Sequence, residues 1–296
     1  DRKCMIKFEA KDTAFHRNHS FSCGGRTLNR QGPLLMGILN ITPDSFYGGS
    51  RVVTADEIIR KAGQMLSEGA DILDIGAMST RPGAAEISEE EELERLLPAL
   101  RLIMQHFPDC FVSVDTWRAE VARRSLELGA FMINDISGGT FDAAMAELIG
   151  RNDVPYIMMH IKGRPADMQA NPIGAGDVLD EVKAFFNQQL ELFGQYGSRQ
   201  LITDPGFGFG KTMEANYLML SKLPELRAGN FPQLVGISRK SMIYKRLSIN
   251  VEDALNGTTA LNTLALMFGA DILRVHDVKE ARQTIELLKT LTEVSG

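Results

Sequence analysis

From residue 34 onward, the chain alternates short apolar runs with longer segments whose apolar residues recur every three or four positions. The first pattern is typical of buried strands and the second of amphipathic helices. Apolar runs that are bounded by turn residues and alternate with helices predict βαβ units and a parallel sheet. The predicted strands are 34–40, 71–77, 111–116, 131–137, 155–161, 201–207, 233–239 and 272–276.

The segments of helical period carry start signals. Thr54 and Glu57 form an S/T-x-x-E capping box at the start of the first helix. Ser88 is expected to be the N-cap of the next helix, whose first turn holds the acidic residues 89–92. Negative charge there complements the positive end of the helix dipole, which explains the acidic run without any function. The other delimited helices are 118–128, 177–195, 213–222, 253–268 and 278–293.

Eight strand–helix units in about 260 residues match the usual size of a (β/α)8 TIM barrel. The main alternative is a doubly wound open sheet, which would show a glycine-rich phosphate turn after the first strand. The turn at 40–44 contains no glycine, so the barrel is favoured. Residues 1–33 lack the alternating pattern, and Gly24-Gly25 predicts a β-hairpin there. We therefore predict an α/β protein: a hairpin extension (1–33) that caps the barrel, and a (β/α)8 barrel (34–296).

The composition narrows the range of partners. The net charge is −6 and the Lys and Arg residues are scattered, so no nucleic-acid partner is expected. No apolar stretch reaches the roughly 18 residues that a membrane helix needs, and no secretory signal is visible. The three cysteines have no metal-ligand spacing, which fits a reducing compartment. A cytoplasmic location without membrane contact is expected.

Polar or charged residues recur where the apolar runs end. A single one of them would be explained by capping or by a salt bridge. Several together predict one site, because the strand ends of a parallel barrel meet at one face, where barrel enzymes carry their chemistry. These residues are Asn40, Asp115, Asn134, Asp204, Lys240, Arg274 and His276.

The first group of these residues suits a flat polar ring. The carboxylates of Asp115 and Asp204 can each accept a pair of N–H groups. Asn134 can both donate and accept, and Lys240 donates. Two acids, an amide and an ammonium facing one cavity predict the binding of a heterocycle with alternating donors and acceptors.

The second group suits an anion. Arg274 and His276 are two apart on one predicted strand, so their side chains point to the same side. With Arg81 from a loop, they predict an anion clamp. Asn40 is suited to bind Mg²⁺ through its carbonyl oxygen, since this ion often takes one or two protein ligands and completes its shell with substrate phosphates. No Cys/His cluster predicts zinc.

Two other features are weighed against function. Residues 206–212 approximate the P-loop motif G-x-x-x-x-G-K-[ST], but Pro205 stands where the first glycine should be and has no N–H for a phosphate. An NTPase is therefore not expected, and the glycines are predicted to let the backbone pass close to a ligand. Among the histidines, His160 is left open between a structural and a supporting role. The others, His16, His19 and His106, are predicted to lie on the surface.

Five motifs together resemble the dihydropteroate synthase family. They occur in order from about residue 34 to the C-terminus, and their combination is specific. The motifs are Asn40-Ile-Thr-Pro-Asp-Ser-Phe46, Ser79-Thr80-Arg81-Pro82-Gly83, Asp204-Pro-Gly-Phe-Gly-Phe-Gly-Lys211, Ser238-Arg239-Lys240 and Arg274-Val-His276-Asp277-Val278.

The resemblance implies a transferase of folate biosynthesis that joins 6-hydroxymethyl-7,8-dihydropterin diphosphate to p-aminobenzoate and releases pyrophosphate. It implies Asn40, Lys240, Arg274 and His276 as catalytic residues, with Mg²⁺ at Asn40. It also implies a homodimer through the last helices and a sulfonamide target. The implied substrate-binding residues are Asp115, Asn134, Asp204 and Lys240 for the pterin; Thr80, Arg274, Val275 and His276 for the diphosphate side; and Phe46, Arg81, Pro82, Phe209, Lys240 and Ser241 for the aminobenzoate.

The chain departs from the family pattern in two places. An acid is usual in the family at the position of Gly48, so any role for a carboxylate in the first loop is in doubt. Ala77-Met78 stands where the family often has Gly-Glu. Two alternatives remain open at this point. A corrinoid-dependent methyltransferase would share the heterocycle pocket but has no pyrophosphate to bind. A non-catalytic homologue would be expected to lack Asn40, Lys240 or Arg274, and all three are present.

Overall fold

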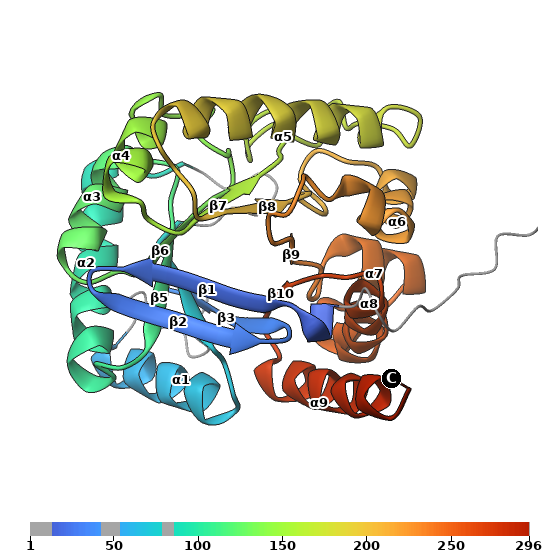
Figure 1. Cartoon of the computed structure of the whole chain (residues 1–296), viewed down its shortest axis with the longest axis horizontal. Helices are drawn as coiled ribbons and strands as arrows, with labels where there is room; N and C mark the ends of the chain where they lie inside the picture. Colours follow the sequence, from blue (N-terminus) through green and yellow to red (C-terminus); the bar gives the residue numbers. More distant parts are fainter. Residues whose placement is uncertain (1–13, 43–53, 79–85, 296) are drawn as a thin grey trace, which may run out of the picture.

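The structure is a computed structural model that describes residues 14–42, 54–78 and 86–295. Its central sheet has eight parallel strands in the order β8-β7-β6-β5-β4-β3-β10-β9 (Figure 1). The two end strands are joined by a parallel bridge between Thr203 and Gln233, so the barrel is nearly closed. The strands are β3 (Leu34–Asn40), β4 (Ile72–Gly76), β5 (Phe111–Asp115), β6 (Met132–Asp135), β7 (Tyr156–Met159), β8 (Leu201–Asp204), β9 (Leu234–Val235) and β10 (Ile272–Val275). The TIM-barrel prediction is confirmed.

Helices surround the barrel and follow its strands (Figure 1). The predicted caps are confirmed: Thr54 and Glu57 form the capping box, and the Ser88 side chain accepts a hydrogen bond from the backbone N–H of Glu91. The α-helices are α1 (Ala55–Ser67), α2 (Glu89–His106), α3 (Ala119–Glu127), α4 (Ala144–Asn152), α5 (Val178–Gln195), α6 (Met213–Ser221), α7 (Ser241–Leu247), α8 (Leu255–Met267) and α9 (Val278–Ser295). Short 3-10 helices are η2 (Ala14–His16), η4 (Leu223–Leu226) and η5 (Val251–Ala254).

Alternation along the strands separates two cores. The side chains on the outer faces of the strands pack against the helices and form the main core, which includes Leu35, Leu73 and Val275. The side chains on the inner faces fill the lower half of the barrel and include Ile72, Ile202 and Ile272. Because this inner core plugs the barrel at the N-terminal ends of the strands, only the C-terminal ends leave room for polar chemistry.

The predicted N-terminal hairpin is confirmed. Strands β1 (Asn18–Cys23) and β2 (Arg26–Gln31) pair antiparallel, and the turn places Gly24 and Gly25 at φ +59° and +75°. Both angles lie in the left-handed region, which glycine adopts without strain. The hairpin residues Phe21 and Leu28 belong to the inner core, so the hairpin packs on the N-terminal end of the barrel. The division into an extension (1–33) and a barrel (34–296) stays a prediction.

Polar contacts also tie the hairpin segment to this end of the barrel. The guanidinium of Arg17 donates to the Asp271 carboxylate over 2.7 Å, and Arg30 pairs with Asp71 at 3.1 Å. The side-chain amide of Gln200 donates to the backbone carbonyl of Ser22 and accepts from its N–H. Charged and polar contacts therefore surround the inner core at this end of the barrel.

His19 corrects one prediction, because it is buried and not on the surface. It is only 5% exposed, and its Nε2 lies 3.5 Å from a carboxylate oxygen of Asp271. Burial lowers the pKa of His19, opposed by Asp271. His19 points inward because it alternates with exposed residues on β1, a pattern hidden by its polar side chain. The other two histidines predicted on the surface, His16 and His106, are exposed.

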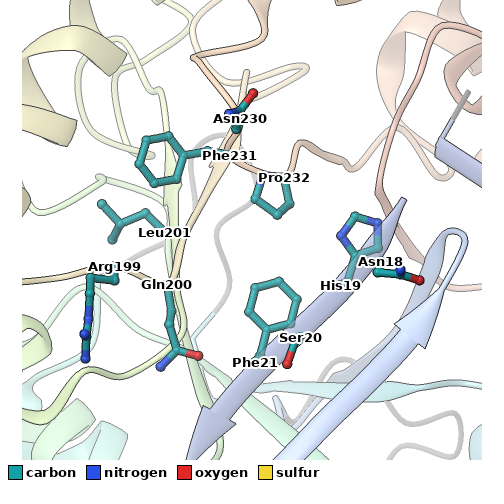
Figure 2. A pocket seen from close by; sticks show the side chains of 10 residues that line it. All are labelled: Asn18, His19, Ser20, Phe21, Arg199, Gln200, Leu201, Asn230, Phe231 and Pro232. Atoms are coloured by element: carbon teal, nitrogen blue, oxygen red, sulfur yellow. The ribbon is translucent and has the colours of Figure 1, made fainter. Parts of the chain in front are cut away.

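His19 also lines a cavity of about 320 Å³ between β1 and the residues 199–201 and 230–232 (Figure 2). Its walls carry apolar groups such as Phe21, Phe231 and Pro232. The cavity lies at the hairpin end of the barrel, and none of the predicted site residues lines it.

Along the described ranges, no helix combines the length and the apolar character that a membrane span requires.

Candidate active site

Four predicted site residues converge at the C-terminal end of the barrel. Asp115 and Asn134 are register partners on β5 and β6. Asp204 ends β8, and Arg274 lies on β10. All four occupy inward positions, in alternation with the outward residues of the main core. The side chain of Val275 is outward and fully buried in the main core, so only its backbone faces the barrel mouth.

Arg274 is held by two carboxylates. Its Nε donates to Asp74 over 2.7 Å, and a terminal nitrogen donates to Asp115 over 2.8 Å. The side-chain amide of Asn134 donates to the same Asp74 oxygen over 3.0 Å. The two groups predicted from the sequence, one for a ring and one for an anion, are thus joined in one network.

Asp74 is a site residue that the sequence prediction missed. It is completely buried on β4, and one of its carboxylate oxygens accepts both hydrogen bonds just described. It was overlooked because it lies in the middle of an apolar run and not at its end. The available signal was the charge itself, since an acid inside a buried strand needs partners.

Burial shifts the pKa values of the ionisable groups at this end of the barrel. Burial raises the pKa of Asp115 to about 7; Arg274 opposes this shift, and Asp74 adds to it. Burial also raises the pKa of Asp204, opposed by Lys240. The pKa of Lys240 is lowered to about 8 by burial, with Asp204 opposing. Pairs of groups with pKa values shifted toward neutral pH, as those of Asp115 and Lys240 are, are characteristic of functional sites.

Lys240 approaches the network from the turn after β9. Its Nζ donates to the backbone carbonyl of Phe207 over 2.6 Å and lies 4.6 Å from the centre of the Phe209 ring. Gly236 lies close to both cations: a Cβ there would make ordinary van der Waals contacts, 3.8 Å from the Cβ of Arg274 and 3.9 Å from the Nζ of Lys240. Ser241 follows as the first residue of α7 and is half-buried.

Arg239 anchors this turn. Its guanidinium makes two hydrogen bonds to Asp277, at 2.7 and 2.8 Å, and donates to the carbonyls of Val251 and Glu252. Its φ of +54° lies in the left-handed region, which is unfavourable for a residue with a side chain. The bidentate ion pair offsets this strain and fixes the direction from which Lys240 enters the site.

His276 lies at the rim, beyond Arg274. It is exposed, and its Nδ1 lies 3.1 Å from the Ser238 hydroxyl, which also accepts the backbone N–H of His276. Asn40 ends β3, the strand next to β10, and is half-buried. The structure thus places both residues at the face that holds Arg274.

An apolar group flanks the polar network. Met78, Trp117, Ile136 and Met159 end strands β4 to β7 or follow them by one or two residues, and they form one buried cluster, against which Phe209 packs. We call these five residues the mouth cluster. Only Phe209 among them was predicted from the sequence to belong to the site. Polar groups beside an apolar surface suit a flat aromatic ligand, because the faces of such a ligand pack against apolar side chains and its rim forms hydrogen bonds.

His160 lies behind Asp204. It is 5% exposed, and its backbone N–H donates to the carbonyl of Asp204 over 3.0 Å. Its ring meets the Phe185 ring edge to face at 5.1 Å. Burial, followed by the charges of Lys211 and Lys162, lowers its pKa to about 2, so the ring stays neutral. Both the structural and the supporting role of His160 stay predictions.

Part of the predicted site lies outside the described residues, namely Phe46, Thr80, Arg81, Pro82 and the position of Gly48. Within the described ranges, no three His, Cys, Asp or Glu side chains gather where they would hold a metal ion. A cation shared between the oxygen of Asn40 and substrate phosphates is compatible with this arrangement, because Mg²⁺ needs few protein ligands.

Comparisons with known proteins agree with this geometry. The sequence profile of pterin binding enzymes matches residues 36–276. A dihydropteroate synthase of Synechocystis sp. is 45% identical over 260 residues, which cover 87% of this chain and 89% of that protein. The crystal structure of Yersinia pestis dihydropteroate synthase with a sulfonamide drug superposes with a TM-score of 0.86 at 39% identity, covering 93% of this chain and 100% of that one. The Xanthomonas albilineans enzyme with 4-aminobenzoic acid gives a TM-score of 0.85 at 35% identity, covering 93% and 98%.

Proposed function

Because this chain belongs to the dihydropteroate synthase family of pterin binding enzymes, we propose that it joins 6-hydroxymethyl-7,8-dihydropterin diphosphate to p-aminobenzoate and releases pyrophosphate. The observation that carries the proposal is the buried network of Asp74, Asp115, Asn134 and Arg274 at the barrel mouth, inside the part of the chain that the family profile covers. A corrinoid-dependent methyltransferase is disfavoured, because the relatives over most of the chain are dihydropteroate synthases.

The pterin ring is bound by Asp115, Asn134, Asp204 and Lys240. Their support is the mixture of acceptors and donors that they present and their position beside the mouth cluster. The buried members of the mouth cluster, Met78, Trp117, Ile136 and Met159, receive the face of the pterin ring, while the polar groups bind its edge. The raised pKa values of Asp115 and Asp204 agree with acids buried to accept the N–H groups of a ligand.

The bond that breaks joins the pterin methylene carbon to the diphosphate oxygen, and the new bond joins that carbon to the aminobenzoate nitrogen, which loses a proton. Negative charge develops on the leaving diphosphate, where Arg274, His276 and Thr80 provide positive charge and donors. The carboxylates of Asp115 and Asp204 lie beside the carbon that becomes positive. No protein nucleophile is required, since the amine attacks directly.

Asn40 would hold Mg²⁺ together with the substrate diphosphate, and the ion would add positive charge at the leaving group. The support is the position of Asn40 at the C-terminal end of β3, the strand that pairs with β10, which carries Arg274. The aminobenzoate pocket comprises Phe209, Lys240 and Ser241, together with Phe46, Arg81 and Pro82. Its support is the closeness of Phe209 to Lys240 at the edge of the network. Sulfonamides, which one relative binds in a solved structure, are expected to compete there.

A homodimer through the last helices completes the proposal. Leu264 on α8 and Leu287 and Val294 on α9 are 37%, 74% and 78% exposed. α8 and α9 pack against each other, so these apolar residues lie on adjoining helices. Exposed apolar groups on neighbouring elements favour an interface between copies. Sedimentation velocity is expected to give a dimer, and Leu287→Asp to shift it toward monomer.

The decisive experiment measures pyrophosphate release from the pterin diphosphate with and without p-aminobenzoate. Release that depends on the aminobenzoate, with formation of dihydropteroate, is expected. Release that is independent of it would indicate a hydrolase, and no release would contradict the proposal.

Asp204→Asn tests the binding of the ring. The substitution keeps the size of the side chain but replaces one accepting oxygen by a donor, so we expect about a 10- to 100-fold loss of pterin affinity. Titration calorimetry with the pterin diphosphate measures it. The matched control is Asp71→Asn, whose carboxylate pairs with Arg282 at the opposite end of the barrel. Unchanged affinity in Asp204→Asn would remove this residue from the ring site.

A further inference from the structure

The segment that imitates a P-loop, residues 205–212, has a role that the reaction does not explain. In a P-loop, backbone N–H groups surround a phosphate. Here the carbonyl oxygens converge on the lysine of the segment itself. The Nζ of Lys211 donates to the carbonyls of Gly206, Phe209 and His160 over 2.9, 3.0 and 3.1 Å. An ammonium has three N–H groups, and each has one acceptor.

Burying the charged side chain of Lys211 costs free energy, so a lysine is an unusual residue for holding a loop in place. The residue is 3% exposed, and none of the ion pairs found in the described part of the chain includes it. Burial lowers its pKa to about 7, opposed by the nearby Asp204. A buried ammonium is tolerated only where hydrogen bonds replace its water, so the three carbonyls and the lysine hold one another in place.

The glycines fit the loop to this arrangement. Gly206, Gly208 and Gly210 all have positive φ, at +71°, +83° and +67°. A Cβ on Gly206 would collide with the carbonyl oxygen of His160, and one on Gly210 would lie 2.6 Å from the carbonyl oxygen of Lys162. The close approach of Gly206 and Gly210 is thus to the neighbouring chain segment 160–162, and the predicted approach of these glycines to a ligand stays a prediction.

The loop that Lys211 holds also contributes groups to the proposed site. The N–H of Gly206 donates to the Asp204 carboxylate over 2.8 Å. The carbonyl of Phe207 accepts from Lys240, and the ring of Phe209 lies under the same ammonium. Lys211 thus holds the loop from within, while Lys240 contacts it from the site. A shift of the loop would move the Phe209 ring and the acceptor of Lys240 together.

We propose that Lys211 is a positioning residue that sets the aminobenzoate side of the site through the carbonyls of Gly206 and Phe209. This inference rests on the proposed function. Asp204 belongs to β8 and is held by the sheet, whereas Phe209 depends on the loop. Loss of Lys211 should therefore weaken aminobenzoate binding far more than pterin binding.

Lys211→Met tests this inference, because it keeps the length of the side chain and removes the donors. The KM for p-aminobenzoate is expected to rise at least about 10-fold, while the KM for the pterin diphosphate stays within about 3-fold. Lys211→Gln retains two N–H donors, so its KM for p-aminobenzoate should lie between those of Lys211→Met and the wild type. Lys222→Met is the control, since this exposed lysine pairs with Glu225 outside the site.

A purely structural lysine would change both KM values together or lower only the amount of folded protein, and either result would overturn the inference. Asn216 accepts the N–H of Gly208 over 2.6 Å and keeps part of the loop in place in the variants. If Lys211→Met does not fold, Lys211→Gln is compared with the wild type instead. The test is again whether the KM for p-aminobenzoate rises more than the KM for the pterin diphosphate. A wild type without aminobenzoate-dependent turnover would instead refute the proposed function. Normal wild-type turnover with unchanged KM values in both variants refutes only the role of Lys211.

Discussion

Asp74 shows how one buried carboxylate organises the site. It accepts from Arg274 and Asn134 on two other strands, so it fixes the relation between residues proposed for the diphosphate and for the ring. In Asp74→Asn the charge is lost and Arg274 retains only Asp115. We expect kcat/KM to fall at least about 100-fold, because small displacements of catalytic groups have effects of this size.

Asp71→Asn is the matched control for Asp74→Asn. Asp71 lies just before β4, at the opposite end of the barrel, where it accepts from Arg282 and from the backbone N–H of Leu35. This variant should lose stability but retain kcat/KM within about 2-fold. If both variants lost activity to the same degree after correction for folded protein, the special role of Asp74 would be rejected.

His160 gives the protein a predictable dependence on pH. Its pKa is lowered from 6.5 to about 2 in the folded protein, chiefly by burial. Below pH 6.5 the unfolded chain binds a proton there and the folded protein does not, so stability falls as the pH decreases. Between pH 7 and pH 5 this loss is about 2 kcal/mol.

His160→Gln should remove this part of the pH dependence. Urea unfolding at pH 7 and pH 5 measures it, with the exposed His106→Gln as the control. The difference between the two pH values should shrink by about 2 kcal/mol in His160→Gln only. Equal pH dependence in all three proteins would show that His160 takes up its proton in the folded state.

Polar residues at strand ends were predictable, and most of the buried polar residues elsewhere were not. Asp115, Asn134 and Asp204 stood out because an apolar run stops at each of them. Asp74, His19 and Lys211 are equally buried, but their partners come from distant parts of the chain. A sequence pattern shows that a polar group is buried without showing what satisfies it. For the same reason, the link between Arg274 and Asp115 was not foreseen.

At the scale of elements, local chemistry was the better guide. The helix starts at Thr54 and Ser88 were predicted because a capping side chain acts within its own turn. Strand β9 is only two residues long, although seven residues were predicted. Its apolar run continues into residues such as Ile237, which belong to the main core without pairing in the sheet. Burial and strand pairing therefore diverge there.

Ser88→Ala tests the cap of α2. The side chain accepts from the N–H of Glu91 at 3.2 Å, and its loss should lower the free energy of unfolding by about 1 kcal/mol. Ser67→Ala, at the last residue of α1, removes an exposed hydroxyl that donates to the Gln64 carbonyl and should cost less. Chemical denaturation measures both. A cost in Ser88→Ala no larger than in Ser67→Ala would mean that the cap adds nothing to stability.

At the scale of the whole molecule, the two ends of the barrel have different tasks. The C-terminal ends of the strands carry the network around Arg274, whereas the N-terminal ends carry the inner core and the hairpin. The apolar inner core therefore separates the buried charges of the site from those at the hairpin end, such as Asp271. Substitutions in the hairpin should therefore change stability and leave the chemistry intact.

Leu28→Ala tests this separation and the predicted domain division together. Leu28 on β2 is 7% exposed and packs in the inner core, so its truncation should lower the free energy of unfolding by about 2–4 kcal/mol. The value of kcat/KM should stay within about 2-fold, and the exposed Leu247→Ala should change neither quantity.

Calorimetry then distinguishes two arrangements. A single transition at lower temperature means that hairpin and barrel unfold as one cooperative unit, because they share the inner core. A separate early transition, with the barrel transition unchanged, would mean that residues 1–33 form an independent extension. The shared burial of Phe21 and Leu28 with strand residues such as Ile72 favours the single transition.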